Sequence, residues 1–334
     1  MMRILVTGGA GYIGGTVARL LLSQGHRVTV FDNLCHSKRM AVAEGAEFIQ
    51  GDLVDRLLVE KTLREGKFDG VMHFAALIEA GESMKVPEIY FRNNTMATLT
   101  LLESMLATGH DRIVFSSTAA CYGEPESTPI LEDAKLEPTN PYGESKLLVE
   151  KMLRWLSEAY GLRYASLRYF NVAGAIEGYG EAHEPESHLI PLILDVALGR
   201  RASIKVFGTD YPTKDGSCVR DYIHVRDLAE AHLLALGALR EKSRLIYNIG
   251  NGQGFTVLEV IDAVRRVTGR AIPVELCDPR PGDPAVLVAS SEKIKAELGW
   301  QPQFAELDKI IASAWEWHQR RYQQTVEMPI SANV

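Results

Sequence analysis

Thr7-Gly8-Gly9-Ala10-Gly11-Tyr12-Ile13-Gly14 is the stretch of sequence that decides the fold. It follows an apolar run, Arg3 to Thr7, that predicts a short strand, and it begins an amphipathic run, Tyr12 to Ser23, that predicts a helix. Three of its glycines are spaced three residues apart, and glycine is needed where a turn requires a positive φ or where backbone approaches a pyrophosphate. The N–H groups at the start of the helix would face that anion. The stretch therefore predicts a dinucleotide-binding turn between a strand and a helix.

An acidic residue at the end of the next expected strand supports this interpretation. The run Arg27 to Phe31 predicts a second strand, and Asp32 follows it, 18 residues beyond Gly14. That spacing is close to the one expected of the acid that hydrogen-bonds the adenosine ribose. A carboxylate there repels a 2′-phosphate, so NAD is favoured over NADP. A turn that uses its glycines for packing alone is the alternative.

Apolar runs and helical stretches alternate through the first half of the chain. Further strands are expected at Glu47–Gln50, Gly70–Phe74, Arg112–Ser116 and Arg163–Tyr169. This alternation, with nearly continuous apolar strands, predicts an α/β fold of the Rossmann type with a doubly wound parallel sheet. After about Asn171 the elements shorten. We expect an NAD-binding Rossmann domain at 1–171 and a smaller mixed α/β, mainly substrate-binding domain at 172–334, with some segments returning to the first.

The composition excludes several classes of protein. The 334 residues include 36 Lys and Arg against 43 Asp and Glu, a formal charge of −7, which excludes binding of nucleic acid through bulk positive charge. Any anionic ligand must therefore meet a local basic cluster. No run approaches the roughly 18 apolar residues of a membrane span. No two of the four cysteines have metal-ligand spacing, and the first expected strand leaves no room for a signal peptide. We expect a cytoplasmic protein without a membrane partner or a metal.

Tyr142 and Lys146 are candidates for proton transfer. They lie four residues apart at the start of a helix expected from Pro141 to about Tyr160, so they share a helix face. A neighbouring ammonium favours the phenolate and lowers the pKa of a phenol from its usual value near 10. A Tyr tuned in this way can take a proton from a sugar hydroxyl while hydride leaves to NAD⁺. A surface Tyr beside a solvated Lys is the alternative.

The same helix is apolar on a second side. One stripe holds Val149, Leu153 and Leu156, and the other holds Leu148, Met152, Trp155 and Ala159. A second helix, expected at about Asn94 to Ala107, is also apolar. Helices that are apolar on two sides must cover two surfaces. One surface is the sheet; the other is either extra core or a partner subunit, in a homodimer held by a four-helix bundle.

Taken together, the motifs of the chain resemble those of the extended short-chain dehydrogenase/reductase superfamily and, within it, the family of UDP-glucose 4-epimerases. The resemblance runs from Ile4 to about Trp300. Beyond the glycine-rich stretch and Pro141-Tyr142-Gly143-Glu144-Ser145-Lys146, it rests on Phe31-Asp32-Asn33-Leu34, Gly51-Asp52-Leu53, His73-Phe74-Ala75-Ala76, Phe115-Ser116-Ser117-Thr118-Ala119-Ala120-Cys121-Tyr122-Gly123, Arg168-Tyr169-Phe170-Asn171, the stretch from Asp215 to Val225, and Arg280-Pro281-Gly282-Asp283.

The resemblance implies roles for residues around a bound NAD. Tyr142 would be the base and acid at the sugar 4-hydroxyl, Lys146 would bind the nicotinamide ribose and lower the pKa of Tyr142, and the Thr118 hydroxyl would bridge the substrate oxygen and Tyr142. The remaining cofactor contacts implied are Gly8, Gly11, Tyr12, Ile13, Gly14, Asp32, Asn33, Leu34, Cys35, Ser37, Asp52, Leu53, Phe74, Ala75, Ala76, Asn93 and Phe170.

The resemblance also implies a UDP-sugar substrate. Asn171, Arg220 and Arg280 would bind its diphosphate, which supplies the local basic cluster that the acidic composition requires. Phe207 would lie against the uracil and Asp283 would bind a ribose hydroxyl. Thr118, Tyr142, Leu189 and Leu287 complete the expected substrate contacts. As alternatives, Arg220 could pair with Asp221 or Asp227, and Arg280 could be a solvated loop charge. His224 is expected to be structural.

The implied reaction is interconversion of UDP-glucose and UDP-galactose. C4 is oxidised by NAD⁺, the 4-keto sugar turns in the pocket, and hydride and proton return to the other face. Another NAD-dependent nucleotide-sugar epimerase of the superfamily is one alternative. A nucleotide-sugar 4,6-dehydratase is another, but that family places Asp-Glu directly after the residue matching Thr118, and here Ala119 and Ala120 follow it. A non-catalytic dinucleotide sensor is the alternative of another class, although such proteins typically lose the Tyr or the Lys. Leu287 stands at the position facing the sugar 2-substituent; Leu is intermediate in size, so N-acetylated UDP-sugars are further candidate substrates.

Overall fold

A seven-stranded parallel sheet forms the centre of the molecule. The computed structural model describes residues 1–280 and 283–327, and its main sheet has the strand order β12-β6-β5-β4-β1-β2-β3. These strands are β1 Arg3–Thr7, β2 Arg27–Asp32, β3 Glu47–Gln50, β4 Gly70–His73, β5 Arg112–Thr118, β6 Arg163–Tyr169 and β12 Arg244–Ile249. The order reverses between β1 and β4, which is where ligands bind in sheets of this kind. The six strands expected from sequence are confirmed to within two residues.

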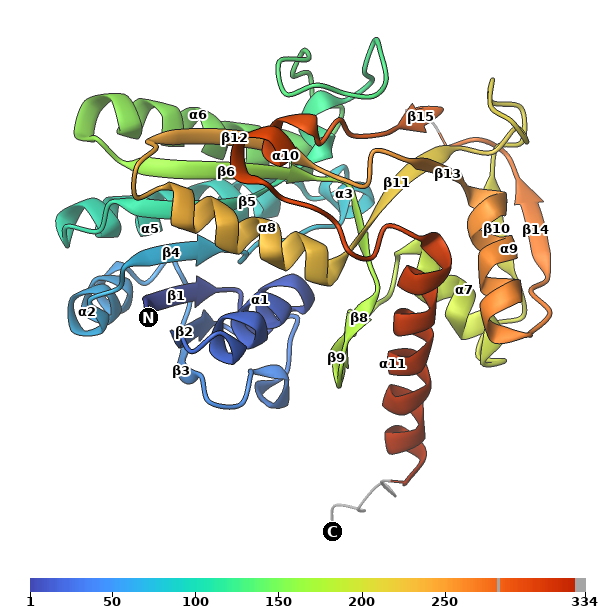
Figure 1. Cartoon of the computed structure of the whole chain (residues 1–334), viewed down its shortest axis with the longest axis horizontal. Coiled ribbons are helices and arrows are strands. Elements are labelled where there is room, and N and C mark those ends of the chain that lie inside the picture. Colours follow the sequence, from blue (N-terminus) through green and yellow to red (C-terminus); the bar gives the residue numbers. More distant parts are fainter. Residues whose placement is uncertain (281–282, 328–334) are drawn as a thin grey trace.

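Helices cover both faces of the sheet (Figure 1). One face is covered by α1 (Tyr12–Ser23), α8 (Val225–Ala238) and α10 (Glu292–Leu298), and the other by α2 (Arg56–Gly66), α5 (Ala97–Ala107) and α6 (Pro141–Tyr160). Strand β1 contributes side chains to the core on each face of the sheet. Ile4 and Val6 belong to the first core, under α1, α8 and α10, and Leu5 between them belongs to the second core, under α2, α5 and α6. The sheet is therefore buried on both sides, as its continuous apolar strands predict.

Local sequence sets the ends of α6, the helix that carries Tyr142. The Asn140 side chain accepts a hydrogen bond of 2.9 Å from the Gly143 N–H, and Pro141 occupies the first turn, where its missing N–H costs nothing. The helix ends at Gly161, whose φ of +73° places it in the left-handed region that favours glycine. Tyr142 is thus held at a capped helix start rather than in a flexible loop.

A second region is built from shorter elements. Strand β11 (Val219–His224) pairs with β13 (Gly254–Thr256) and β15 (Val286–Leu287) through its first half and with β7 (Asn171–Ala173) through its second half. Because β7 directly follows β6, this register brings Arg220 next to the central sheet. The other elements are β8 Ala175–Ile176, β9 Tyr179–Gly180, α7 Leu189–Ala197, β10 Ile204–Phe207, α9 Val257–Thr268, β14 Val274–Cys277 and α11 Leu307–Glu327.

Short helical turns connect the main elements. They are η1 Arg39–Ala41, α3 Ala80–Ser83, α4 Pro87–Tyr90, the π-helical η2 Phe91–Met96, and η3 Ala119–Tyr122. The helix expected at about Asn94 to Ala107 is therefore η2 followed by α5. No helix among the described residues is both long and apolar enough to cross a membrane.

Strand β12 was not expected from the sequence. It pairs with β6 residue for residue, from Arg244 opposite Tyr164 to Ile249 opposite Tyr169, and its Leu245, Tyr247 and Ile249 are buried. Helix α8, which precedes it, packs against α1 in the first core. Segments that follow Asn171 by more than 50 residues thus complete the sheet and one of its helical layers.

The Asp221 carboxylate ties three segments of the second region together. Its Oδ1 accepts a hydrogen bond from the Asn251 N–H at 2.8 Å, and its Oδ2 accepts from the Gly252 and Ala289 N–H groups, each at 3.1 Å. The side chain is fully buried, and burial raises its pKa from 3.8 to about 6, against the opposing effect of the three amide hydrogen bonds. The folded protein therefore holds the proton of Asp221 at a pH where the unfolded chain has released it.

Asp221→Asn should reveal this linkage. Because the folded pKa lies above the ordinary one, the stabilising contribution of protonation is present below pH 4 and is lost as the pH rises through 6, a change of about 3 kcal/mol. Urea unfolding at several pH values should show the stability of the wild type, relative to that of the variant, falling by roughly this amount between pH 4 and pH 7. Asp210→Asn, at an exposed position, is the control. Parallel pH curves for wild type and Asp221→Asn would contradict the assignment.

Candidate active site

The glycine-rich turn lies at the carboxyl end of β1, at the reversal of strand order. Gly8 has a φ of +72°, and a Cβ on it would stand 2.5 Å from the Ala75 N, in the segment after β4. A Cβ on Gly14 would overlap the Gly8 carbonyl. By contrast, the nearest atom to a Cβ on Gly11 is 3.4 Å away, and no side chain caps α1 at this residue. Gly8 and Gly14 thus serve close packing, while Gly11 and the uncapped N–H groups of α1 present the surface that fits a pyrophosphate.

Gly8→Ala should weaken cofactor binding. The substitution adds both left-handed strain and a collision with the backbone of Ala75, so the turn and the β4 segment must move apart. Isothermal titration with NAD should show a loss of affinity of at least about tenfold, the equivalent of ~1.4 kcal/mol. Gly25→Ala is the matched control, because Gly25 has a similar φ of +78° and nothing within 4 Å. Equal NAD affinity in both variants would show that the collision does not matter.

The acids expected at the adenosine end are held in one hydrogen-bonded loop. Asp32, at the end of β2, accepts from the Ala10 N–H at 3.0 Å, so it ties the glycine-rich turn to the next strand. The same carboxylate accepts from the Leu34 N–H at 2.8 Å and from Ser37 Oγ at 3.1 Å. Asn33 donates to Asp52 at 2.9 Å and accepts from the Cys35 N–H at 3.1 Å, and Leu53, next to Asp52, is buried. A carboxylate offers about four acceptor positions, so Asp32 keeps capacity for a ribose hydroxyl.

Tyr142 and Thr118 meet where α6 begins beside the end of β5. The Tyr142 N–H donates to Ser83 Oγ at 3.2 Å, and Thr118 Oγ1 accepts from the Ala120 N–H at 3.1 Å, which fixes both residues. Burial raises the pKa of the Tyr142 phenol to about 12, while its hydrogen bond with Thr118 lowers it and the nearby Cys121 and Glu79 raise it. The structure therefore places the Tyr142 phenol and the Thr118 hydroxyl close enough to interact.

Lys146 lies one turn further along α6 and is buried. Its Nζ donates to the Ser116 carbonyl at 2.9 Å and lies 5.0 Å from the centre of the Phe115 ring. Burial lowers the pKa of this ammonium to about 8. Lys146, which was expected to lower the pKa of Tyr142, is not among the groups that shift that pKa in this structure, where burial raises it and Thr118, Cys121 and Glu79 have smaller effects. The Lys146 ammonium binds the Ser116 carbonyl at the end of β5 instead.

The segment that follows β4 lies between the glycine-rich turn and α6. Phe74, Ala75 and Ala76 follow His73, which lies between Thr7 Oγ1 (2.6 Å) and Thr98 Oγ1 (2.7 Å). Burial, followed by the charge of Lys146, lowers the pKa of His73 to about 3, so this ring is neutral. Asn93, an expected cofactor contact, donates a hydrogen bond to the side chain of Asn94. Asn94 was not expected from the sequence; it accepts from the Leu77 N–H, donates to the Leu77 carbonyl and donates to Ser145.

The basic cluster expected for an anionic substrate is present beside β11. Arg220 and Arg280 both form ion pairs with Asp283, the second at 2.8 Å, and the Arg280 guanidinium lies 5.0 Å from the centre of the Phe207 ring. Two arginines and one carboxylate leave a net charge of +1. Pairing of Arg220 with Asp221 or Asp227 does not occur, because backbone N–H groups occupy both of those acids. Pro281 and Gly282 of this motif lie outside the described residues.

The remaining expected substrate residues lie on several elements. Leu287 pairs with Arg220 across β15 and β11 and packs with Phe170, Ala119 and Tyr122. Asn171 donates to the Asp221 carbonyl at 3.2 Å, and Leu189 begins α7. His224 is structural, as expected: it accepts from the Arg226 N–H, contacts Ser313 and stacks on Phe304. The structure thus brings η3, β11 and the residue after β6 together around Leu287.

A buried ion pair beneath this site was missed. Glu150, two turns after Tyr142 on α6, binds Arg168 through both carboxylate oxygens, at 3.0 and 2.5 Å, and accepts from Ser117 Oγ at 2.6 Å. Arg168 also donates to Tyr122, which donates to Asn248 on β12. The pair links α6 to the strands that carry Thr118. An Arg inside the apolar strand Arg163–Tyr169 was the signal, because a buried cation requires a partner.

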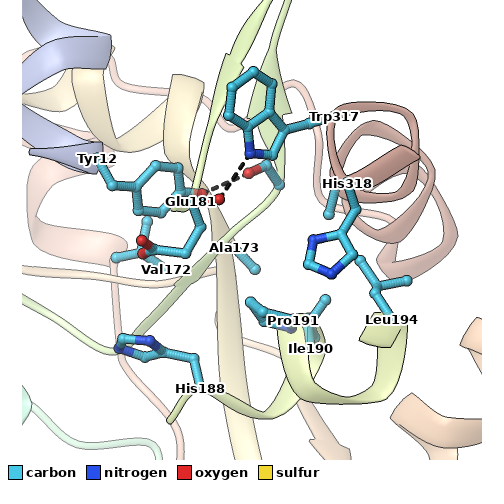
Figure 2. Close-up of a pocket in the computed structure, with 12 residues that line it drawn as sticks. Tyr12, Val172, Ala173, Glu181, His188, Ile190, Pro191, Leu194, Trp317 and His318 are labelled. Carbon is cyan, nitrogen blue, oxygen red and sulfur yellow. Dashed lines mark hydrogen bonds between the residues drawn. The ribbon is translucent and has the colours of Figure 1, made fainter. Parts of the chain in front are cut away.

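Further contacts hold the glycine-rich turn against the second region, beside a cavity lined by Tyr12, Glu181 and Trp317 (Figure 2). Tyr12 donates to the Gly174 carbonyl at 2.6 Å, and Tyr179 donates to the Gly11 carbonyl at 2.9 Å. Trp317 on α11 donates to the Glu181 carbonyl at 2.7 Å. The cavity between these groups measures about 20 Å³, enough for one water molecule and far too small for a nucleotide. These tyrosines therefore brace the turn.

The arrangement of glycine-rich turn, ribose acid and Tyr-Thr-Lys group agrees with a comparison against known families. The model of the NAD dependent epimerase/dehydratase family matches residues 4–250. The chain belongs to this family. Membership confirms the resemblance noted in the sequence, and the family's dependence on NAD agrees with the uncapped start of α1 and the acid at the end of β2.

Curated members of this epimerase/dehydratase family are similar over nearly the whole chain. A UDP-glucose 4-epimerase of Streptomyces lividans is 54% identical over 318 residues, which are 95% of this chain and 96% of the relative. One of Lacticaseibacillus casei is 51% identical over 321 residues, covering 95% and 97% of the two chains.

Solved structures of the epimerase/dehydratase family share the whole fold. A crystal structure of a UDP-glucose 4-epimerase that is 50% identical has a TM-score of 0.94 and covers 96% of this chain and 98% of its own. One from Brucella ovis, in complex with NAD, is 42% identical with a TM-score of 0.92, covering 95% and 99%. The Rossmann-type fold expected from sequence is confirmed.

Proposed function

We propose that this family member interconverts UDP-glucose and UDP-galactose by reversible oxidation at C4 with bound NAD. The observation that carries the proposal is the pairing of Tyr142 with Thr118 at the cofactor edge of the sheet, beside a net positive cluster. Ala119 and Ala120 follow Thr118, so no carboxyl group stands there to eliminate water as a 4,6-dehydratase requires. The similarity to curated UDP-glucose 4-epimerases adds support.

In the proposed mechanism, the protein's own side chains orient the sugar and move its proton. NAD supplies the hydride acceptor when it is bound. Tyr142 takes the proton of the 4-hydroxyl through a hydrogen bond shared with Thr118, and returns it when C4 is reduced from its other face. Lys146 binds the nicotinamide ribose. Burial raises the pKa of the Tyr142 phenol to about 12, so a positive charge beside the hydroxyl is needed to favour its deprotonation. The cationic nicotinamide ring of NAD⁺ would supply that charge when it is bound.

Arg220 and Arg280 are proposed to bind the diphosphate. Both guanidinium groups contact Asp283 and together carry one more positive charge than that carboxylate neutralises. A diphosphate would bind these guanidinium groups either beside the Asp283 carboxylate or in its place. Phe207, under the Arg280 guanidinium, offers a face for the uracil. The wider sets of cofactor and substrate residues given above are proposed with the same roles.

The proposal is tested with UDP-galactose and purified protein without added NAD. UDP-glucose is the expected product, because the cofactor is regenerated in each turnover. Separation of the nucleotides by anion exchange distinguishes the outcomes: a 4-keto-6-deoxy product would favour a dehydratase, and NAD binding without any product would favour a sensor. The absence of conversion both with and without added NAD would overturn the proposal.

A wider substrate range is proposed from Leu287. Leu287 and Phe170 pack against the small cluster that contains Ala119, so the size of residue 287 should determine how much space is left for the sugar 2-substituent. We propose activity on UDP-N-acetylgalactosamine as well. Comparing the two galactose substrates in wild type and in Leu287→Tyr tests this idea, since the larger side chain should lower only the rate with the N-acetylated sugar. Equal loss with both substrates would argue against a role in selection.

The second apolar face of α6 is proposed to form a homodimer. A groove of about 290 Å³ between α6 and the start of α5 is lined by Thr95, Leu99, Leu148, Lys151, Met152, Trp155 and Leu156. Trp155 is 59% exposed and Met96 62% exposed on the same surface, which is large for such side chains on a monomer. Two copies of this helix pair would form a four-helix bundle. Trp155→Glu should shift the mass measured by light scattering from dimer to monomer. Leu57→Glu, at an exposed position of α2 outside the groove, should not.

We propose a cytoplasmic location and a division of the chain into two parts. The four cysteines are all free, which suits a reducing cytoplasm. We also keep the division into an NAD-binding part, 1–171, and a mainly substrate-binding part, 172–334, with α8 and β12 returning to the sheet.

A further inference from the structure

The segment between β9 and α7 holds a cluster that the proposed reaction does not use. One ring nitrogen each of His183 and His188 and a carboxylate oxygen of Glu186 lie within 4.8 Å of one another. Among the described residues, this is the one group of three His, Cys, Asp or Glu side chains so close together. All three side chains are partly buried, so they are neither a solvated surface patch nor part of the apolar core.

One donor atom of the cluster lacks a partner. The Nδ1 of His183 is shielded from solvent and has no hydrogen bond within the described part of the chain. The nearest acid is Glu79, whose Oε1 lies 3.5 Å away and approaches from the segment after β4. A buried imidazole nitrogen without a partner is costly, and a metal ion would satisfy it.

The other groups of the cluster are already oriented. Glu186 Oε1 accepts from the His188 ring at 2.8 Å and from the Ser187 and His188 N–H groups, each also at 2.8 Å. Glu79 Oε1 accepts from Ser187 Oγ at 2.9 Å, which ties it to the same segment. Two imidazoles and two carboxylates thus converge from two parts of the chain that are about 100 residues apart in sequence.

We propose that His183, Glu186 and His188 bind a divalent transition-metal ion, Zn²⁺ being the best fit, with Glu79 as the fourth ligand. Imidazole nitrogens and carboxylate oxygens are ordinary zinc ligands, and four of them complete a tetrahedral shell. In such a shell, with bonds of about 2.0–2.1 Å, neighbouring ligand atoms stand roughly 3.4 Å apart. The donor atoms of His183, Glu186 and His188 now lie within 4.8 Å of one another, so they would have to approach by up to about 1.4 Å to reach that spacing.

The ion would connect the two halves of the candidate active site. Glu79 immediately precedes α3, whose Ser83 accepts the Tyr142 N–H, and His188 immediately precedes Leu189 at the start of α7. A metal bound between them would hold the 181–188 segment against the residues beside Tyr142. We assign the ion a structural role, as a clamp between these two segments.

Equilibrium dialysis of the intact protein against Zn²⁺ alone tests the proposal. About one ion per chain is expected to bind, and His183→Ala and His188→Gln should each weaken binding by more than about tenfold, the scale on which even outer-shell changes act. Zn²⁺ should also raise the thermal unfolding midpoint of the wild type and leave that of the variants unchanged. His110→Gln, far from the cluster, is the control for a general loss of histidine.

Co²⁺ provides a second readout that excludes the exposed thiol of Cys35 as the site. A four-coordinate nitrogen and oxygen site gives visible d–d bands without a thiolate charge-transfer band. Bands of this kind that disappear in His188→Gln support the proposal. Zinc binding that is equal in wild type and both histidine variants, binding that disappears in Cys35→Ser, or no bound zinc at all would each overturn it.

Discussion

Tyr142→Phe is expected to lower the turnover of UDP-galactose by about 10²–10⁴-fold, the range typical of a lost general acid–base group. The variant removes only the hydroxyl, which is paired with Thr118 and stands where the proton of the sugar must go. The ring and the start of α6 stay in place, since Asn140 caps the helix independently. NAD binding should therefore be preserved. Steady-state kinetics and the NAD content of the purified variant measure the two effects separately.

Tyr160→Phe is the matched control for this substitution. Tyr160 is the last residue of the same helix and is 69% exposed, so the loss of its hydroxyl should leave turnover unchanged. Turnover in Tyr142→Phe within a factor of two of the wild type would remove Tyr142 from the mechanism. A loss of bound NAD in that variant would instead show that the hydroxyl organises the cofactor site.

Glu150→Ala is expected to reduce the free energy of unfolding by about 3–5 kcal/mol, because it leaves the buried Arg168 cation without its partner. Glu150 and Arg168 are 7% and 2% exposed, and they share two hydrogen bonds. The variant also removes the acceptor of Ser117, next to Thr118, so turnover should fall together with stability. Urea unfolding and steady-state kinetics provide the measurements.

Glu158→Ala on the same helix is the matched control for the buried pair. Its partner Arg244 lies 3.1 Å away, and both side chains are about 40% exposed, so this substitution should cost only about 0–1 kcal/mol. Replacing Glu150 and Arg168 together by Met should recover much of the stability, because no unpaired charge remains. Similar stabilities of Glu150→Ala and Glu158→Ala would show that burial does not strengthen the dependence of Arg168 on its partner.

The sequence predicts the cofactor half of the fold well, because its signals are local. A strand, a glycine-rich turn and a helix follow one another within residues 3–23, and the structure confirms each of them. Asp32 likewise stands at the end of its strand, as expected; its contact with the Ala10 N–H of the glycine-rich turn was not foreseen. Tyr142 and Lys146 share a helix face by their spacing alone, so their neighbourhood could be foreseen.

Features that depend on distant segments could not be foreseen. Strand β12 is as short and apolar as many core segments, and only its pairing with β6 makes it part of the sheet. The direction of the Lys146 ammonium depends on the Ser116 carbonyl, a backbone group that no sequence pattern reveals. Arg220 and Arg280 were expected to meet a diphosphate, but their joint ion pairing with Asp283 follows from the register of β11 and β15.

The late arrival of β12 has a consequence for how the chain folds as it is synthesised. The last residue of β6 is Tyr169 and the last residue of β12 is Ile249, so 80 further residues must emerge before β6 gains its outer neighbour. At about 5–20 residues per second, β6 remains an open sheet edge for roughly 4–16 s. An unpaired apolar edge invites pairing with other chains. Nascent chains stalled between these two strands are therefore the stage at which this protein is most exposed to aggregation, and the stage at which a chaperone would protect it most.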